Sequence, residues 1–194
     1  AAELMQNFGS FLTQKMYTNN TSNAVIAYHG YLAGYELLAE AANSTEIAAL
    51  LDEAYEEINQ TLVAELQVNP QQQEAFAKKA RAKYTDWTIV DRLIRHGKDP
   101  LRKLGAQDRL IAPARMALAH GIYPRVIIET IAKALFFDEP SDPSALKLKA
   151  MRKEKGITYV LKQVCELDEQ EQLFQEILKA VEKLRAEGLV KGHE

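Results

Sequence analysis

The sequence has few of the residues that stabilise secreted or metal-binding proteins. Its single cysteine, Cys165, excludes an intrachain disulfide and fits a reducing compartment. Its four histidines are scattered along the chain, so they predict no metal site. No apolar run is long enough to cross a bilayer, and no signal peptide is visible. We therefore expect a cytoplasmic protein in which Cys165 is a small buried hydrophobic residue.

The motifs that bind nucleotides are also missing. The chain has no G-x-G-x-x-G after a predicted strand and no G-x-x-x-x-G-K-[ST] segment, and it lacks H-E-x-x-H and paired C-x-x-C motifs. The formal net charge is −3, and aromatic residues do not interleave with the cations. The residues present therefore predict no nucleotide site and no nucleic-acid partner.

Helical periodicity covers most of the sequence, and no segment alternates in the manner of a strand. We predict an all-α protein with one domain over residues 1–194 and nine or so helices. The residues at 43–46 and at 69–70 have the chemistry of helix N-termini, and Gly188 is expected to end the last helix. The predicted helices span about 3–17, 22–42, 44–68, 70–84, 115–120, 125–137, 145–155, 157–165 and 168–187. The helix at 70–84 is polar on most sides and is expected at the surface.

A polar segment, QKMYTNNTSN at 14–23, separates the first two predicted helices. Its Lys15, Asn20 and Asn23 are five and three residues apart. On a regular α-helix Asn20 and Asn23 share a face, but Lys15 does not join them. Their convergence therefore requires a helix break or a π-type bulge near residues 18–19, and such bulges are frequent at functional sites.

Two interpretations of this segment remain open. The spacing alone favours an interhelix turn, with Lys15 at the surface and Asn20 among the capping residues. The alternative is a catalytic site, in which the apolar neighbours Phe11, Met16 and Tyr17 partly desolvate Lys15. Burial lowers the pKa of a lysine, which then becomes a useful general acid or base. An adjacent asparagine would donate a hydrogen bond to a carbonyl oxygen.

A basic segment at 85–111 is the second distinctive region, and Gly97, Pro100 and Gly105 interrupt its regular structure. Arginine and lysine in such a loop grip phosphate or carboxylate groups. A solvated face with aspartates as counter-ions explains the composition equally well. The cations are Arg95, Lys98, Arg102, Lys103 and Arg109, and the aspartates are Asp91, Asp99 and Asp108.

Three passages together resemble a known family. Residues 15–24 are similar to its K-x4-N-x2-H segment, and residues 27–34 to the helix that follows. The most specific passage is DPLRKL at 99–104 with DRLIAP at 108–113, which resembles DPxRKL…DRLxxP. The chain is similar to the polyol-specific long-chain dehydrogenases, most closely the mannitol-1-phosphate 5-dehydrogenases. It resembles only their C-terminal, substrate-binding domain, which is all-α and of the 6-phosphogluconate dehydrogenase C-terminal-like type.

The resemblance implies an NAD-dependent oxidoreductase that interconverts a sugar alcohol, or its phosphate, with the ketose. Lys15 would be the catalytic acid or base, and Asn20 would polarise the reacting oxygen. NAD would be bound mainly by an N-terminal Rossmann domain that precedes Ala1, so this chain alone is expected to be inactive. The remaining residues that the resemblance assigns to the substrate are Asn23, Arg95, Arg102, Lys103 and Arg109.

Asn23 departs from the family, which usually has histidine there, and asparagine does not titrate near neutrality. Two further hypotheses therefore stay open: a non-catalytic homologue that binds a sugar phosphate and regulates, and a helical interaction module. The enzyme hypothesis predicts a hydrophobic patch near the first helix and Lys15, which the missing domain covers in cis. Through this patch the isolated chain is expected to self-associate.

Overall fold

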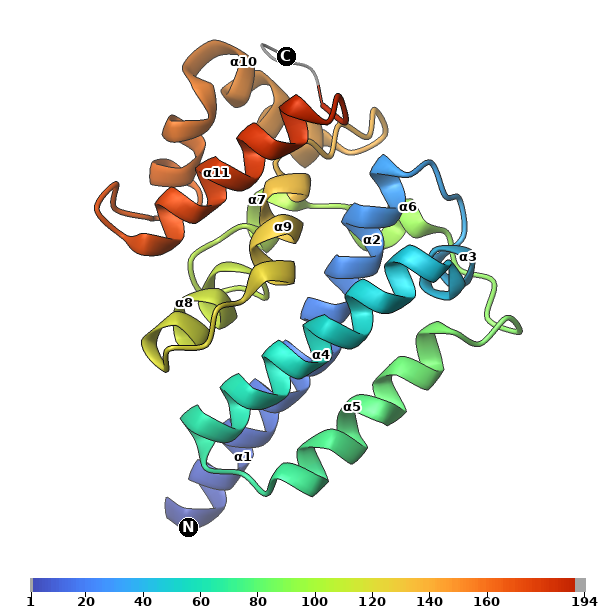
Figure 1. Ribbon diagram of the computed structural model, residues 1–194, viewed down its shortest axis with the longest axis vertical. Coiled ribbons are helices and arrows are strands. Elements are labelled where there is room, and N and C mark those ends of the chain that lie inside the picture. Colours follow the sequence, from blue (N-terminus) through green and yellow to red (C-terminus); the bar gives the residue numbers. More distant parts are fainter. Residues whose placement is uncertain (1, 191–194) are drawn as a thin grey trace.

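The structure, a computed structural model, describes residues 2–190, with side chains from residue 8 onward. His193 and the side chains of Leu4 and Met5 lie outside the described part. Figure 1 shows helices joined by short connections, and the described residues form no strand, which confirms the predicted all-α fold. No helix among them is both long and apolar enough to cross a membrane.

Eleven α-helices and one π-helix make up the described part of the chain. The basic segment, predicted only as irregular structure, contains the two short helices α6 and α7. The helices are α1 (Ala2–Lys15), η1 (Met16–Thr21), α2 (Ser22–Leu32), α3 (Leu38–Asn43), α4 (Thr45–Leu66), α5 (Pro70–Tyr84), α6 (Leu93–Gly97), α7 (Pro100–Lys103), α8 (Ile111–Ala119), α9 (Arg125–Ala134), α10 (Pro143–Gln163) and α11 (Gln172–Ala186).

Side-chain caps start helices where the sequence predicts them. The Ser44 hydroxyl accepts a hydrogen bond from Ile47 N at 3.3 Å, at the start of α4. Asn69 Oδ1 accepts from Gln72 N at 3.0 Å, and Pro70 occupies the first turn of α5. Each cap satisfies a backbone donor that has no partner inside its helix. Local sequence therefore determines where α4 and α5 begin.

The predicted helix at 22–42 is wrong, because it is two helices separated by a turn. α2 ends at Leu32, and Gly34 has a φ of +83°, a left-handed conformation that glycine adopts without strain. The chain then extends at Leu37, which forms an antiparallel bridge with Arg92. Leu38 N also donates to Asp91 O at 3.0 Å. This distant pairing holds Asp91 against the start of α3.

Two glycines near the C-terminus lie where predicted helices end, although only Gly188 was expected to cause a helix end. Gly156 separates the expected helices at 145–155 and 157–165, because its φ of +83° interrupts α10. Gly188, with a φ of +71°, follows the last residues of α11. Cys165 is fully buried just after α10, which confirms the structural interpretation, and burial raises the pKa of its thiol to about 12.

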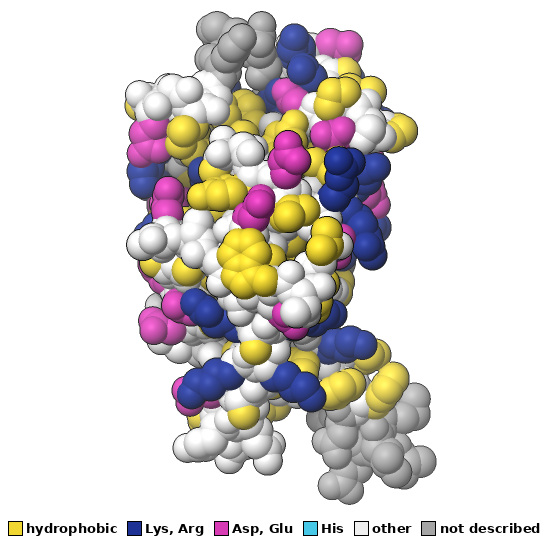
Figure 2. Space-filling view, turned by 90° about the vertical axis from the view of Figure 1, so that its right-hand side faces the viewer, with side chains coloured by type: hydrophobic (Ala, Val, Ile, Leu, Met, Phe, Trp, Pro, Cys, Tyr) yellow, Lys and Arg dark blue, Asp and Glu magenta, His cyan; other side chains and the backbone are white. Residues whose placement is uncertain are grey.

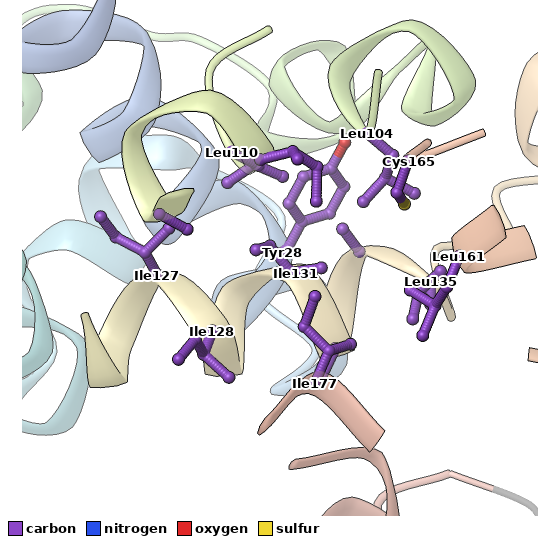
Figure 3. Packing of buried hydrophobic residues seen from close by; sticks show 14 of the residues in the cluster. Tyr28, Leu104, Leu110, Ile127, Ile128, Ile131, Leu135, Leu161, Cys165 and Ile177 are labelled. Atoms are coloured by element: carbon purple, nitrogen blue, oxygen red, sulfur yellow. The ribbon is translucent and has the colours of Figure 1, made fainter. Parts of the chain in front are cut away.

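Helix α2 lies at the centre of the molecule and packs against α4, α6 and α9 (Figure 1). Tyr28 on α2 is buried among apolar side chains of several helices, as Figure 3 shows. Its hydroxyl donates to Gly97 O at 3.0 Å, at the end of α6. A Cβ at Gly97 would lie 2.4 Å from the Phe137 ring, so only glycine allows this close packing. The core thus fixes the position of α6, which carries part of the basic segment.

Candidate active site

A π-helix joins α1 to α2 at the polar segment, which confirms the predicted bulge. Lys15 is the last residue of α1, Asn20 lies in η1, and Asn23 lies in the first turn of α2. The i→i+5 hydrogen bonds of a π-helix stack residues five apart, so Lys15 and Asn20 come to one side. The offset of three then adds Asn23 to the same side.

Contacts from distant segments hold the π-helix in place. The Thr21 hydroxyl donates to Arg109 O at 2.6 Å, and the Tyr84 hydroxyl donates to Asn19 O at 2.7 Å. Gln73 Nε2 on α5 donates to the buried Thr18 hydroxyl at 3.0 Å. These three hydrogen bonds therefore tie η1 to α5 and to the basic segment.

The polar segment faces the basic segment across a concavity of about 900 Å³. We call residues 15–23 the junction wall and residues 91–109 the basic wall. Helix α5 contributes a third side. All seven residues assigned to the site from sequence line this concavity: Lys15, Asn20, Asn23, Arg95, Arg102, Lys103 and Arg109. The arrangement satisfies the geometric requirement for a shared site.

Lys15 and Asn20 keep hydrogen-bonding capacity free. Lys15 is exposed, and its Nζ has no hydrogen-bond or ion-pair partner among the described residues. The expected desolvation of Lys15 is thus absent in this chain, since Phe11 is itself 50% exposed. Asn20 Nδ2 contacts Met16 Sδ at 3.1 Å, a weak acceptor. Both side chains are available to a ligand in the concavity.

The Asn23 side chain is linked by hydrogen bonds to the side chains of His96 and Asp91. Its Nδ2 lies 2.8 Å from Nδ1 of His96, and Nε2 of His96 lies 2.7 Å from Asp91 Oδ2. His29 is elsewhere: it is buried against Thr130, and burial lowers its pKa to about 3. The histidine beside Asn23 is therefore His96, far along the sequence, and not His29.

Three arginines of the basic wall, Arg95, Arg102 and Arg109, are paired with aspartates of the same wall. Arg102 binds Asp99 at 2.7 Å and Asp108 at 3.1 Å, and Arg109 Nε binds Asp108 at 2.8 Å. Arg95 pairs with Asp91 at 3.2 Å. The aspartates therefore act as counter-ions for these arginines, as one of the two interpretations expected. The same arginines also line the concavity.

Lys103 is the buried lysine of the site. Its side chain is 5% exposed, and its ammonium donates a hydrogen bond to the backbone carbonyl of His96. Burial, together with the nearby positive charges of Arg109 and Arg102, lowers the pKa of Lys103 to about 8. The desolvation predicted for Lys15 is thus found at Lys103, on the opposite wall.

Sequence reasoning missed several lining residues. Asp91 and His96 were not assigned to the site, and α5 was expected to be only a surface helix. Lys79 and Lys83 of α5 line the concavity and have no ion-pair partner among the described side chains. The helical spacing of Ala77, Ala80 and Tyr84 could have indicated that α5 packs against the rest of the protein, because these residues form its buried face.

Comparison with known sequences identifies relatives. The mannitol dehydrogenase C-terminal domain family matches residues 7–185. Mannitol-1-phosphate 5-dehydrogenase of Bacillus pumilus is 35% identical over 178 residues, which are 92% of this chain and 47% of that protein. The enzyme of the same name from Caldanaerobacter subterraneus is 32% identical, over 94% of this chain and 47% of that protein. The chain thus spans about half the length of these relatives.

Solved structures show the same fold. Mannitol 2-dehydrogenase of Pseudomonas fluorescens, in a ternary complex with NAD and D-mannitol, matches with a TM-score of 0.73 and 17% identity. The match covers 93% of this chain and 39% of that one. Substrate-free D-sorbitol dehydrogenase matches with a TM-score of 0.71 and 18% identity, over 91% of this chain and 39% of that one. The chain belongs to the mannitol dehydrogenase C-terminal domain family.

Proposed function

We propose that this chain is the substrate-binding and proton-transferring domain of an NAD-dependent polyol dehydrogenase. The reaction would interconvert a sugar alcohol and its ketose, such as mannitol 1-phosphate and fructose 6-phosphate. One observation carries the proposal: a π-helix presents Lys15, Asn20 and Asn23 on one wall of a large polar concavity. The names of the relatives support the same reaction class.

In this mechanism Lys15 moves the proton. Its Nζ accepts the proton of the reacting hydroxyl during oxidation and returns it to the carbonyl oxygen during reduction. Asn20 donates a hydrogen bond to that oxygen and stabilises the charge that develops on it. NAD, when bound, supplies the hydride acceptor. The described part of this chain has no strand–turn–helix unit to bind a dinucleotide, so we assign that task to an additional N-terminal domain.

An exposed apolar surface beside the site supports this assignment. Phe8, Phe11 and Leu12 on α1 are 62%, 50% and 47% exposed, and Phe11 lines the concavity. The loop after α5 adds Trp87 and Val90, which are 61% and 80% exposed. Figure 2 shows hydrophobic side chains among lysines and arginines on the face with α5 and this loop. A second domain docked here would exclude water from Lys15, and in its absence the surface would favour self-association.

The charge of the concavity favours an anionic substrate. The three arginines that line the concavity have aspartate partners, whereas Lys79 and Lys83 of α5 have none among the described residues. These lysines are one helical turn apart, and like charges at this spacing repel each other. A phosphate group between them would relieve that repulsion. We therefore propose a sugar-alcohol phosphate, with α5 close to its phosphate.

The test is an activity assay on the full-length gene product. NADH oxidation is followed with fructose 6-phosphate, fructose and hexuronates as substrates. We expect turnover with the phosphorylated ketose and a loss of about 10²–10⁴-fold in Lys15→Ala. Lys147→Ala, which removes an exposed lysine on α10, is the matched control and should keep full activity. Failure of every substrate, or full activity in Lys15→Ala, would contradict the mechanism.

The second candidate function is regulatory: the protein would be a non-catalytic homologue that binds a sugar phosphate. The exposed Lys15 and the non-titrating Asn23 favour it. Calorimetry with fructose 6-phosphate discriminates the two functions: binding by a full-length protein that never oxidises NADH would support the regulator. A protein that binds no sugar phosphate at all would support an interaction module.

A further inference from the structure

We propose that Asp91 and His96 form an orienting pair for Asn23. The pair fixes the Asn23 amide so that its carbonyl oxygen, Oδ1, faces the concavity and accepts a hydrogen bond from a substrate hydroxyl group. The inference rests on the proposed function, because it takes Asn23 as a substrate contact. His96 and Asp91 are positioning residues in this scheme, since they act through Asn23.

The direction of each hydrogen bond follows from chemistry. The carboxylate of Asp91 only accepts, so His96 must donate to it from Nε2–H, across 2.7 Å. In a neutral imidazole the other nitrogen is then an acceptor. His96 Nδ1 accepts from the Asn23 amide nitrogen across 2.8 Å. Because the nitrogen of the amide is engaged, its oxygen is the group left for a ligand.

The fold holds Asp91 and His96 in place. Asp91 is anchored through its backbone carbonyl, which accepts from Leu38 N at 3.0 Å, and its second carboxylate oxygen binds Arg95 at 3.2 Å. The backbone carbonyl of His96 accepts from the buried Lys103. The side chains of His96 and Asp91 are only 19% and 18% exposed, so water competes weakly for these bonds. The amide of Asn23 is therefore pre-oriented before any ligand binds.

A fixed acceptor has a consequence for specificity. A carbonyl oxygen accepts a hydrogen bond from a hydroxyl group but cannot donate to a ketone or ether oxygen. A substrate analogue with a deoxy or O-methyl group at the contacted position would leave this oxygen without a partner. Discrimination by such a contact exceeds what an apolar pocket provides. We expect kcat/KM for the deoxy analogue to be at least about tenfold lower than for the substrate itself.

The orientation can be measured on this chain without any activity. A ¹⁵N long-range NMR spectrum at about pH 9, above the usual titration range of imidazole, distinguishes the two histidine tautomers. We expect His96 as a single Nε2–H tautomer in the wild type, and as a mixture of both tautomers in Asp91→Leu, which has no acceptor for Nε2–H. His120, which pairs with Glu65 at 2.8 Å, is the internal control and should not change. An Nδ1–H tautomer in the wild type, or an unchanged single tautomer in Asp91→Leu, would overturn the proposal.

Kinetics of the full-length protein test the consequence. His96→Asn keeps an acceptor near the position of Nδ1, whereas His96→Leu has none. We expect His96→Leu to raise KM about tenfold or more and His96→Asn to restore most of the loss. His120→Leu should have wild-type kinetics. Equal losses in the two His96 variants would overturn the orienting role. An inactive wild type would contradict the proposed function, and the tautomer measurement would still decide the orientation.

Discussion

The two walls of the concavity differ in how their polar groups are satisfied. On the junction wall, among the described residues, the Lys15 ammonium has no partner and the Asn20 amide contacts only a thioether. On the basic wall, Arg102 and Arg109 are bound to aspartates of the same segment. Groups without internal partners are available to a ligand, whereas paired groups mainly hold their own segment together. We therefore expect substitutions on the junction wall to reduce activity and substitutions on the basic wall to reduce stability first.

After Lys15, the largest expected effect is at Asn20. Asn20→Ala removes the donor proposed to stabilise charge on the reacting oxygen, so we expect kcat to fall about 10²–10³-fold. The free energy of unfolding should stay within about 0.5 kcal/mol of wild type, since Asn20 makes only a weak contact. Steady-state kinetics and urea titration measure both. Gln60→Ala, an exposed amide on α4, is the control. A large loss of stability with little loss of kcat would contradict the expectation that the junction wall serves activity rather than stability.

Lys103 should affect stability in a pH-dependent way. Its pKa is lowered to about 8 in the folded state, below the ordinary value of 10.5. The unfolded chain therefore binds more protons between these pH values, and folding stability should rise with pH across this window. For one group the gain in the free energy of unfolding is about 3 kcal/mol. The contribution of Lys103 is isolated by comparing urea titrations of the wild type and Lys103→Met across this pH range, because the other groups titrate in both proteins. Parallel pH profiles would show that Lys103 is not desolvated.

Asp108 tests the ion pairs of the basic wall. It accepts hydrogen bonds from Arg109 N at 2.7 Å and from Arg102 at 3.1 Å. Burial would raise the pKa of Asp108, but the hydrogen bonds from Arg109 outweigh it and lower the pKa. Asp108→Asn should cost about 1–2 kcal/mol in urea titrations near neutral pH. Because the folded pKa is low, this difference is present above the unfolded pKa and should shrink as pH falls through the folded pKa. An equal difference at low pH would contradict the charge effect.

The smallest expected effects are on α5. Lys79→Ala and Lys83→Ala should each raise KM for a phosphorylated substrate about 2–5-fold, because exposed charges contribute about 1 kcal/mol or less. KM for the unphosphorylated sugar should not change. The effect should weaken at high salt, since salt screens exposed charges. Lys78→Ala is the matched control on the same helix, where Lys78 pairs with Glu74. Equal effects on the KM of both substrates would show that the lysines of α5 do not contact the phosphate group.

Local sequence correctly predicts the features that depend on near neighbours. Ser44 and Asn69 start helices because their side chains reach backbone donors three residues ahead. Gly188 follows α11 with a φ of +71°, as a helix-ending glycine should. Convergence of Lys15, Asn20 and Asn23 was expected to require a helix break or a π-type bulge, and a π-helix is present there. These predictions succeed because each cause lies within one or two helical turns of its effect.

Only the tertiary structure decides which distant side chains meet. The partner of Asn23 is His96, 73 residues away, and no local spacing connects the two. The break after α2 was missed because the extended Leu37 pairs with Arg92 from a distant loop. Burial likewise depends on the whole fold, so Lys103 is desolvated and Lys15 is exposed. Local patterns therefore predict an all-α chain with a polar helix junction at residues 15–23, whereas the pairing of charges in the concavity depends on the fold. The physical reason is that hydrogen bonds and burial depend on distance in space, which sequence spacing specifies only within a helix.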